Sequence, residues 1–223
     1  MISANLEDIR RRIELASKRA GRRPEEITLV AVTKGISLEE IKAAIKRGIS
    51  DIGENRLQEV IPKYNGLQMT YDERRIKWHM IGHLQTNKVK EAVRIFDLIQ
   101  SVDSLRLAQA ISKEAGKINK QQDILLEVKT SPEKSKFGLK PEDTLAVFQE
   151  ISQLPNLNLK GLMTIAPFTD NPEESRPYFR ILKETFRHPT GVRGILSMGM
   201  SNDFEVAIEE GSTMVRLGRA VFE

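Results

Sequence analysis

The segment 27–48, ITLVAVTKGISLEEIKAAIKRG, predicts a β-strand followed directly by an α-helix. Residues 27–32 are a short run of β-branched and aliphatic side chains, which is typical of a strand buried on both faces of a parallel sheet. The spacing of apolar residues then becomes helical over residues 37–47, with Ser37 as the N-cap and Gly48 as the stop. The start of the chain therefore predicts one β–α unit.

The same alternation recurs along the rest of the chain. Further strands are predicted at residues 51–53, 76–81, 96–99, 123–128, 159–163, 194–196 and 213–217. Helices are predicted between them at residues 55–64, 86–95, 103–116, 141–151, 172–186 and 202–210. Asp103 is expected to cap its helix, and Pro141 suits the first turn of the helix that it begins.

Eight strands, each except the last followed by a helix, predict a (β/α)₈ TIM barrel in which residues 1–223 form a single domain. Apolar residues three and four apart predict an extra N-terminal helix over residues 2–20. This helix is expected to cover the gap left by a missing eighth helix, beside the first and last strands. The alternative is a doubly wound open sheet, which would require some of the weaker strands to be loops.

The composition excludes several kinds of site and partner. The absence of Cys excludes a disulfide scaffold, a thiolate zinc site, an iron–sulfur cluster and a Cys nucleophile. The 35 Lys and Arg residues are scattered among 31 Asp and Glu residues, and only 5% of residues are aromatic, so no nucleic-acid surface is indicated. With three His and no metal or phosphate-loop motif, no metal is expected. We expect a cytoplasmic protein without a membrane segment.

Lys34 is the first candidate site residue, because the active site of such a barrel lies at the C-terminal ends of its strands. It shares one face of the first strand with Val30 and Val32, so it points into the barrel mouth if they point inward. Low dielectric there would favour a nucleophilic amine able to form a Schiff base. The alternative is a strand-end lysine that extends into water.

Two further signals fall at the same end of the predicted barrel. The segment 197–203, SMGMSND, offers backbone N–H groups and hydroxyls to an anion, and Gly218 after the eighth strand suits the same role. Arg216 ends the eighth strand facing inward, where a guanidinium needs an acceptor. The respective alternatives are a plain helix cap and a salt bridge from Arg216 to a neighbouring carboxylate such as Glu54. Together with Lys34, these groups match the requirements of a pyridoxal phosphate (PLP) site.

Six segments then carry a resemblance to a known family. They are VAVTK at 30–34, DIGEN at 51–55, WHMIGHLQTNK at 78–88, GLM at 161–163, LSMGMSND at 196–203 and GSTMVRLG at 211–218. Over essentially its whole length the chain resembles the pyridoxal phosphate homeostasis proteins. The resemblance implies a single barrel of the alanine-racemase N-terminal type, which is fold type III among PLP proteins.

The resemblance also implies the roles of individual residues. Lys34 would hold PLP as an internal aldimine, and Ser201, Gly218 and Arg219 would bind its phosphate.

Arg216 would face the pyridine nitrogen of PLP, and Asn55 would lie near the ring. Because a guanidinium does not readily accept the pyridinium proton, the ring would stay neutral and would withdraw electrons weakly. Such a site suits holding and releasing PLP better than carbanion chemistry.

These observations leave three functional hypotheses. The first is a non-catalytic, monomeric PLP carrier or buffer that delivers PLP to PLP-dependent apoenzymes and affects amino-acid metabolism. The second is a PLP-dependent amino-acid racemase, which is disfavoured because Tyr64, Tyr71 and Tyr178 do not lie at strand ends. The third is an RNA- or protein-binding module, which depends only on the sequence pI near 9.2.

Overall fold

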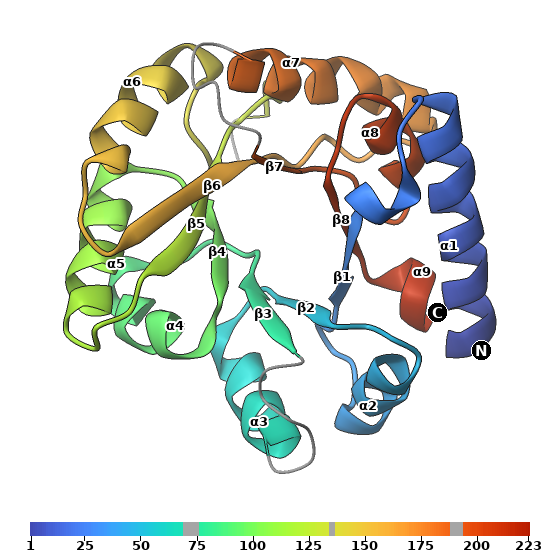
Figure 1. The fold of residues 1–223 in the computed structure, drawn as a ribbon, viewed down its shortest axis with the longest axis horizontal. Coiled ribbons are helices and arrows are strands. Elements are labelled where there is room, and N and C mark those ends of the chain that lie inside the picture. The colour runs from blue at the N-terminus through green and yellow to red at the C-terminus, as the bar shows by residue number, and fades with distance from the viewer. Residues whose placement is uncertain (69–75, 134–136, 188–193) are drawn as a thin grey trace.

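The computed structural model describes residues 1–68, 76–133, 137–187 and 194–223. Its eight parallel strands close into a barrel in chain order, and helices surround them (Figure 1). The strands are β1 (Thr28–Val32), β2 (Asp51–Glu54), β3 (Lys77–Met80), β4 (Leu98–Val102), β5 (Gln122–Glu127), β6 (Leu157–Met163), β7 (Ile195–Ser197) and β8 (Met214–Leu217). The predicted (β/α)₈ barrel is confirmed, and the open-sheet alternative is wrong.

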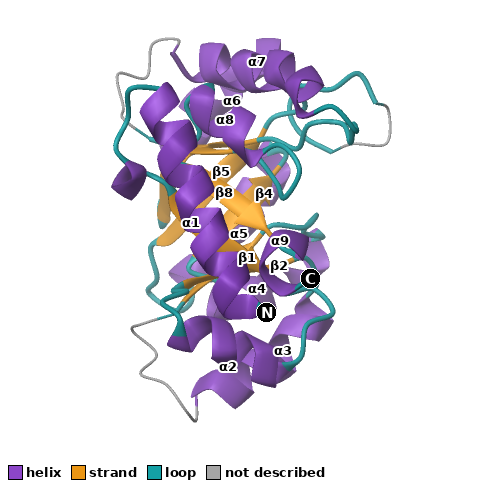
Figure 2. Ribbon diagram, turned by 90° about the vertical axis from the view of Figure 1, so that its right-hand side faces the viewer, coloured by secondary structure: helices purple, strands orange, loops and turns teal. Residues whose placement is uncertain are grey.

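The surrounding helices match the predicted order, with changed boundaries. They are α1 (Ile2–Arg19), α2 (Leu38–Lys46), α3 (Leu57–Gln68), α4 (Val89–Ile95), α5 (Leu105–Gly116), α6 (Pro141–Ser152), α7 (Arg176–Arg187), α8 (Phe204–Glu209) and α9 (Arg219–Phe222). Short 3₁₀ turns, η3 (Thr86–Lys88) and η4 (Pro172–Ser175), precede α4 and α7. Seen from the side, the helices enclose the strands (Figure 2).

Two predicted helix ends are confirmed and one is wrong. The Ser37 hydroxyl accepts from the Glu40 N–H, and the Glu40 carboxylate accepts from the Ser37 N–H, so α2 begins with a capping box. Pro141 opens α6, as expected. Asp103 is not the cap of α5, because the Ser104 hydroxyl accepts from the Leu107 N–H instead.

The end of the chain also differs from the prediction. A one-turn helix, α9, follows β8 where no eighth helix was expected. The N-terminal helix α1 packs against both α8 and α9, and the two chain termini lie close together (Figure 1). The expected covering role of α1 beside β1 and β8 is therefore confirmed, although it shares that role with α9.

The core has two parts, as the closed sheet requires. One large apolar cluster lies between the strands and the helices. A smaller cluster fills the barrel interior with Val30, Leu98, Leu125, Met163 and Met214. Val30 therefore points inward, as the prediction for Lys34 required.

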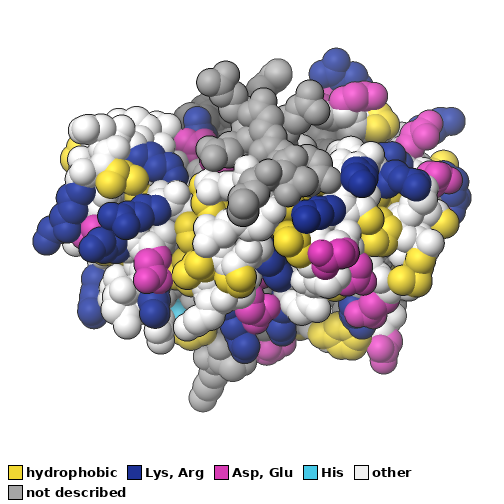
Figure 3. All heavy atoms as spheres, turned by 90° about the horizontal axis from the view of Figure 1, so that it is seen from below, with side chains coloured by type: hydrophobic (Ala, Val, Ile, Leu, Met, Phe, Trp, Pro, Cys, Tyr) yellow, Lys and Arg dark blue, Asp and Glu magenta, His cyan; other side chains and the backbone are white. Residues whose placement is uncertain are grey.

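The surface mixes charges of both signs. On the face seen in Figure 3, Lys and Arg side chains are interspersed with Asp and Glu, which matches the scattered pattern in the sequence. Among the described residues, no helix combines the length and the apolar character that crossing a bilayer would require.

Candidate functional site

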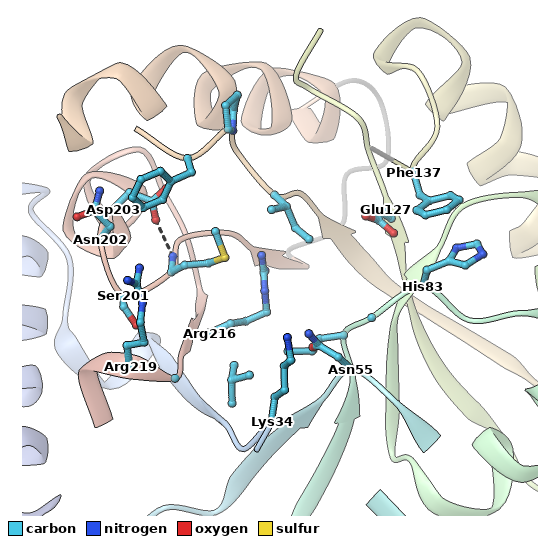
Figure 4. A pocket seen from close by; sticks show the side chains of 18 of the residues that line it. Lys34, Asn55, His83, Glu127, Phe137, Ser201, Asn202, Asp203, Arg216 and Arg219 are labelled. Atoms are coloured by element: carbon cyan, nitrogen blue, oxygen red, sulfur yellow. Dashed lines mark hydrogen bonds between the residues drawn. The ribbon is translucent and has the colours of Figure 1, made fainter. Parts of the chain in front are cut away.

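The C-terminal ends of the strands open into a cavity of about 540 Å³ (Figure 4). Its volume lies in the range of small-molecule sites. All six predicted site residues line it, although they come from positions up to 185 residues apart in the chain. They are Lys34, Asn55, Ser201, Arg216, Gly218 and Arg219.

Lys34 extends from the turn that follows β1. Its side chain points into the cavity (Figure 4). The residue is exposed, so the prediction that Lys34 lies in surroundings of low dielectric is wrong. The turn is closed by a hydrogen bond from the Ile36 N–H to the Thr33 carbonyl, at 3.0 Å. The amine is therefore accessible to a ligand that enters from the mouth.

A buried ion pair supports this turn from below. Lys63 of α3 donates to the Thr33 carbonyl and to Glu54 Oε1, each at 2.6 Å. The Thr33 hydroxyl donates to the same carboxylate oxygen, also at 2.6 Å. Glu54 is fully buried, and these contacts join the residue before Lys34 to the end of β2 and to α3. The sequence segment DIGEN predicted the strand end but not this partnership.

Asn55 follows β2 and lies beside Lys34 at the cavity wall (Figure 4). Its backbone passes so close to Gly82 that a Cβ at position 82 would lie 2.3 Å from the Asn55 carbonyl oxygen. Glycine at position 82 is therefore needed for the loops after β2 and β3 to meet at this rim.

Arg216 of β8 is almost completely buried at the floor of the cavity. Its guanidinium donates to the Ser197 hydroxyl at 2.7 Å and to the Thr164 carbonyl at 2.8 Å. The alternative salt bridge to Glu54 is wrong, because that carboxylate binds Lys63 and Thr33. Burial lowers the pKa of Arg216 to about 10, against the opposing effect of Asp203 and Glu127, so it stays protonated at neutral pH.

The loop after β7 and the start of α9 form the opposite wall. The Ser201 hydroxyl accepts from the Ala220 N–H at 3.2 Å, which ties the two segments together. Within the described part of the chain, the N–H groups of Gly218 and Arg219 have no hydrogen-bond acceptor. Two N–H groups, a hydroxyl and the Arg219 side chain thus converge where an anion can bind.

Asp203 organises this loop and carries a pH-dependent effect. Its carboxylate accepts from the Met200 N–H at 2.6 Å (Figure 4). Burial raises the pKa of Asp203 above its usual value, although that hydrogen bond opposes the rise. Ionisation of Asp203 therefore opposes folding at neutral pH.

The variant Asp203→Asn is expected to be more stable than the wild type at neutral pH. The difference should shrink as pH falls through the raised pKa toward the ordinary value of 3.8, because below both values the wild-type side chain is neutral as well. Urea unfolding of both proteins between pH 7 and pH 4 measures this. A difference that stays constant over this range would contradict the assignment.

Several residues of the cavity were not predicted. His83 and Phe137 stack with ring centroids 3.7 Å apart at one side of the mouth, and His83 also pairs with Asp103 at 3.2 Å. The segment 165–169 after β6 contributes Phe168, whose side chain is largely exposed. The rule that strand ends line the mouth could have found this segment, but no signal in the sequence pairs His83 with Phe137.

Comparison with known proteins begins with a family model. The model described as the alanine racemase N-terminal domain matches residues 4–223. A pyridoxal phosphate homeostasis protein of Aquifex aeolicus is 44% identical over 215 residues, which cover 95% of this chain and 92% of the relative. One from Vibrio alginolyticus is 37% identical and covers 99% of this chain and 96% of the relative.

Solved structures show two degrees of similarity. PipY of Synechococcus elongatus, solved with PLP bound, superposes with a TM-score of 0.85 at 33% identity, and all of each chain is covered. An alanine racemase of Clostridium difficile gives a TM-score of 0.74 at 14% identity, covering 99% of this chain and 56% of the racemase. The second comparison supports the fold alone.

Proposed function

This chain belongs to the alanine racemase N-terminal domain family and, within it, to the pyridoxal phosphate homeostasis proteins, and from that premise we propose that it holds PLP on Lys34 and acts in PLP homeostasis as a non-catalytic carrier. Residues 1–223 would act as one PLP-binding domain. The observation that carries the proposal is a single cavity that combines an accessible amine, a buried cation and unpaired N–H groups.

These three features match three groups of PLP, namely its aldehyde, its ring nitrogen and its phosphate. When bound, PLP supplies an aldehyde that condenses with a primary amine, and it also has a ring nitrogen and a phosphate. The cavity volume of about 540 Å³ accommodates a molecule of this size. The deeply buried Arg216, whose two protein partners leave further N–H donors on the guanidinium, supports the fit most directly.

In this proposal each residue acts on one part of the ligand. Lys34 supplies the amine, and water leaves as its nitrogen bonds to the aldehyde carbon. Ser201, Gly218 and Arg219 bind the phosphate by a hydroxyl, two backbone N–H groups and a guanidinium. Asn55 lies along the ring.

Arg216 determines which chemistry the bound PLP favours. A protonated guanidinium has donors only, so it hydrogen-bonds a ring nitrogen that carries no proton. The neutral ring withdraws electrons weakly, which disfavours carbanion chemistry and favours storage and release. This argument supports a carrier over an enzyme.

For the racemase alternative, neither tyrosine in the described part of the chain supplies a second acid–base group at the cavity. Racemisation by two bases requires such a group on the face opposite Lys34. Tyr64 and Tyr178 lie in α3 and α7 and do not line the cavity, and Tyr71 lies outside the described residues. The likeness to alanine racemases at 14–16% identity adds only the fold.

Partners and location complete the proposal. The recipients would be PLP-dependent apoenzymes in the cytoplasm, and the carrier would act as a monomer. Lys34 is exposed at the mouth, which supports release of the ligand without unfolding of the barrel.

Transfer to an apoenzyme tests the carrier function. The PLP-loaded protein is mixed with an aminotransferase stripped of PLP, and visible absorbance and transaminase activity are followed together. We expect the carrier's absorbance band to fall as aminotransferase activity rises. Retention of the band beside an inactive apoenzyme would contradict a carrier role, and racemisation of an L-amino acid at about 1 s⁻¹ or faster would favour an enzyme.

A further inference from the structure

A chain of hydrogen bonds crosses the barrel interior and ends at Arg216. Arg216 donates to Ser197 at 2.7 Å, and the Ser197 hydroxyl bonds the Gln100 side-chain oxygen at 2.6 Å. Gln100 Nε2 lies 2.9 Å from His79 Nδ1, and His79 Nε2 lies 2.9 Å from Asp51 Oδ1. The five residues come from β8, β7, β4, β3 and β2, so the chain joins five strands across the barrel.

The direction of every bond follows from the donor inventory of the side chains. The guanidinium has no acceptor, so the Ser197 oxygen accepts from Arg216 and its proton goes to the Gln100 oxygen. The Gln100 nitrogen is then the donor to His79, so His79 Nδ1 carries no proton. The proton of neutral His79 is therefore on Nε2 and points at the Asp51 carboxylate. All four donors point away from Arg216.

Burial makes this series of hydrogen bonds rigid. Gln100 and Ser197 are fully buried, and His79 is 2% exposed, so water does not compete for their bonds. Gln100 also contacts the Met214 sulfur at 3.2 Å, which packs its amide against the apolar interior cluster. A buried polar group that loses its partner pays a desolvation cost, so each member holds the next in place.

The bonds to Arg216 fix the plane of its guanidinium. Two of its five N–H donors are used by Ser197 and by the Thr164 carbonyl of the segment after β6. Because the guanidinium is planar, these two bonds set the directions of the other three. The charged groups that act on it are Asp203 and Glu127, while Asp51 lies at the other end of the chain.

We propose that Ser197, Gln100 and His79 are positioning residues that aim the Arg216 guanidinium at the ring nitrogen of the bound ligand, with Asp51 as the distant anchor. The inference rests on the proposed function, since it assigns the ring nitrogen to Arg216. It extends the site from the rim to the opposite end of the barrel. These residues touch the ligand only through Arg216.

The experiment compares two serine variants that make the same change. Ser197→Ala removes the oxygen that receives the Arg216 bond. Ser101→Ala is the matched control, because Ser101 is equally buried and its hydroxyl has no hydrogen-bond partner in the described part of the chain. Each purified protein is titrated with PLP and with an analogue in which a ring C–H replaces the pyridine nitrogen.

We expect Ser197→Ala to weaken PLP binding about tenfold, the effect of misdirecting one charged hydrogen bond. The same variant should bind the analogue as the wild type does, because no ring nitrogen is available to Arg216. Ser101→Ala should bind both ligands normally. If the hydrogen bonds had a purely structural role, Ser197→Ala would weaken the binding of both ligands equally, and that result would overturn the inference.

A second variant, Gln100→Leu, ensures that the result does not depend on the Ser197→Ala substitution alone. Gln100→Leu interrupts the series of hydrogen bonds one residue further from Arg216. It is also expected to weaken the binding of PLP but not that of the analogue. Unchanged PLP affinity in both Ser197→Ala and Gln100→Leu would overturn the inference while leaving the proposed function intact. A wild-type protein that binds neither ligand would overturn the proposed function itself, and with it this inference.

Discussion

Replacing Lys34 with alanine is expected to abolish covalent capture of PLP while the barrel still folds. Borohydride reduction of the PLP-treated wild type should fix one ligand on Lys34, because its exposed amine lines the cavity. Lys34→Ala should show no reduced adduct in the peptide that contains this position and no PLP absorbance shift. Peptide mass spectrometry and the visible spectrum measure the two effects. An exposed rim residue contributes little packing, so the far-ultraviolet circular dichroism should be unchanged.

The control for this experiment is a lysine at the same end of the barrel. Lys129 follows β5 but does not line the cavity, so Lys129→Ala should capture PLP as the wild type does. A reduced adduct on any lysine other than Lys34 in the wild type would contradict the assignment. Capture that persists in Lys34→Ala at the wild-type level would do the same.

Replacing Lys63 with methionine is expected to cost about 3 to 5 kcal/mol of unfolding free energy, the usual effect of removing one partner of a buried ion pair. Glu54 is fully buried, and the second oxygen of its carboxylate has no hydrogen-bond partner among the described residues. Lys63 is the cation bonded to its other oxygen, at 2.6 Å. Lys63→Met would leave that charge without its bonded cation. Urea unfolding at pH 7 measures the loss.

Two further variants separate the buried charge from the change of side chain. Glu54→Gln combined with Lys63→Met should recover much of the loss, because no unpaired charge then lies in the core. Lys117→Met makes the same change in the exposed pair with Glu114 and should leave stability almost unchanged. Equal losses in Lys63→Met and Lys117→Met would contradict the role given to Glu54.

The order of the elements could be predicted because local patterns encode it. Short runs of β-branched residues alternate with helical spacing, and a parallel strand leaves little freedom to a segment such as 27–32. The cap of α2 was predicted because Ser37, a favoured N-cap residue, directly precedes the helical spacing of apolar residues, and the structure adds the reciprocal bond from Glu40. Asp103 and Ser104 are adjacent and both can cap, so only the backbone geometry decided between them.

The candidate site was predictable at residues whose position follows from a strand end. Lys34 and Arg216 each follow inward-facing residues by period-two alternation, and both line the cavity. The protein partners of Arg216 were not predictable, and the alternative salt bridge to Glu54 is wrong, because a partner depends on distances across the barrel. The stacking of His83 on Phe137 joins segments more than 50 residues apart and could not be predicted for the same reason.

The sequence by itself determined the alternating order of the eight strands and their helices, the inward face of the first and last strands, and six of the residues that line the cavity. Only the closed barrel decided which of those groups meet. Lys63 pairs with Glu54, and Arg216 is linked to Asp51 through three side chains from other strands. The physical reason is that hydrophobic periodicity is a local property of the chain, whereas a hydrogen bond acts over about 3 Å and exists only after strands distant in sequence are brought side by side.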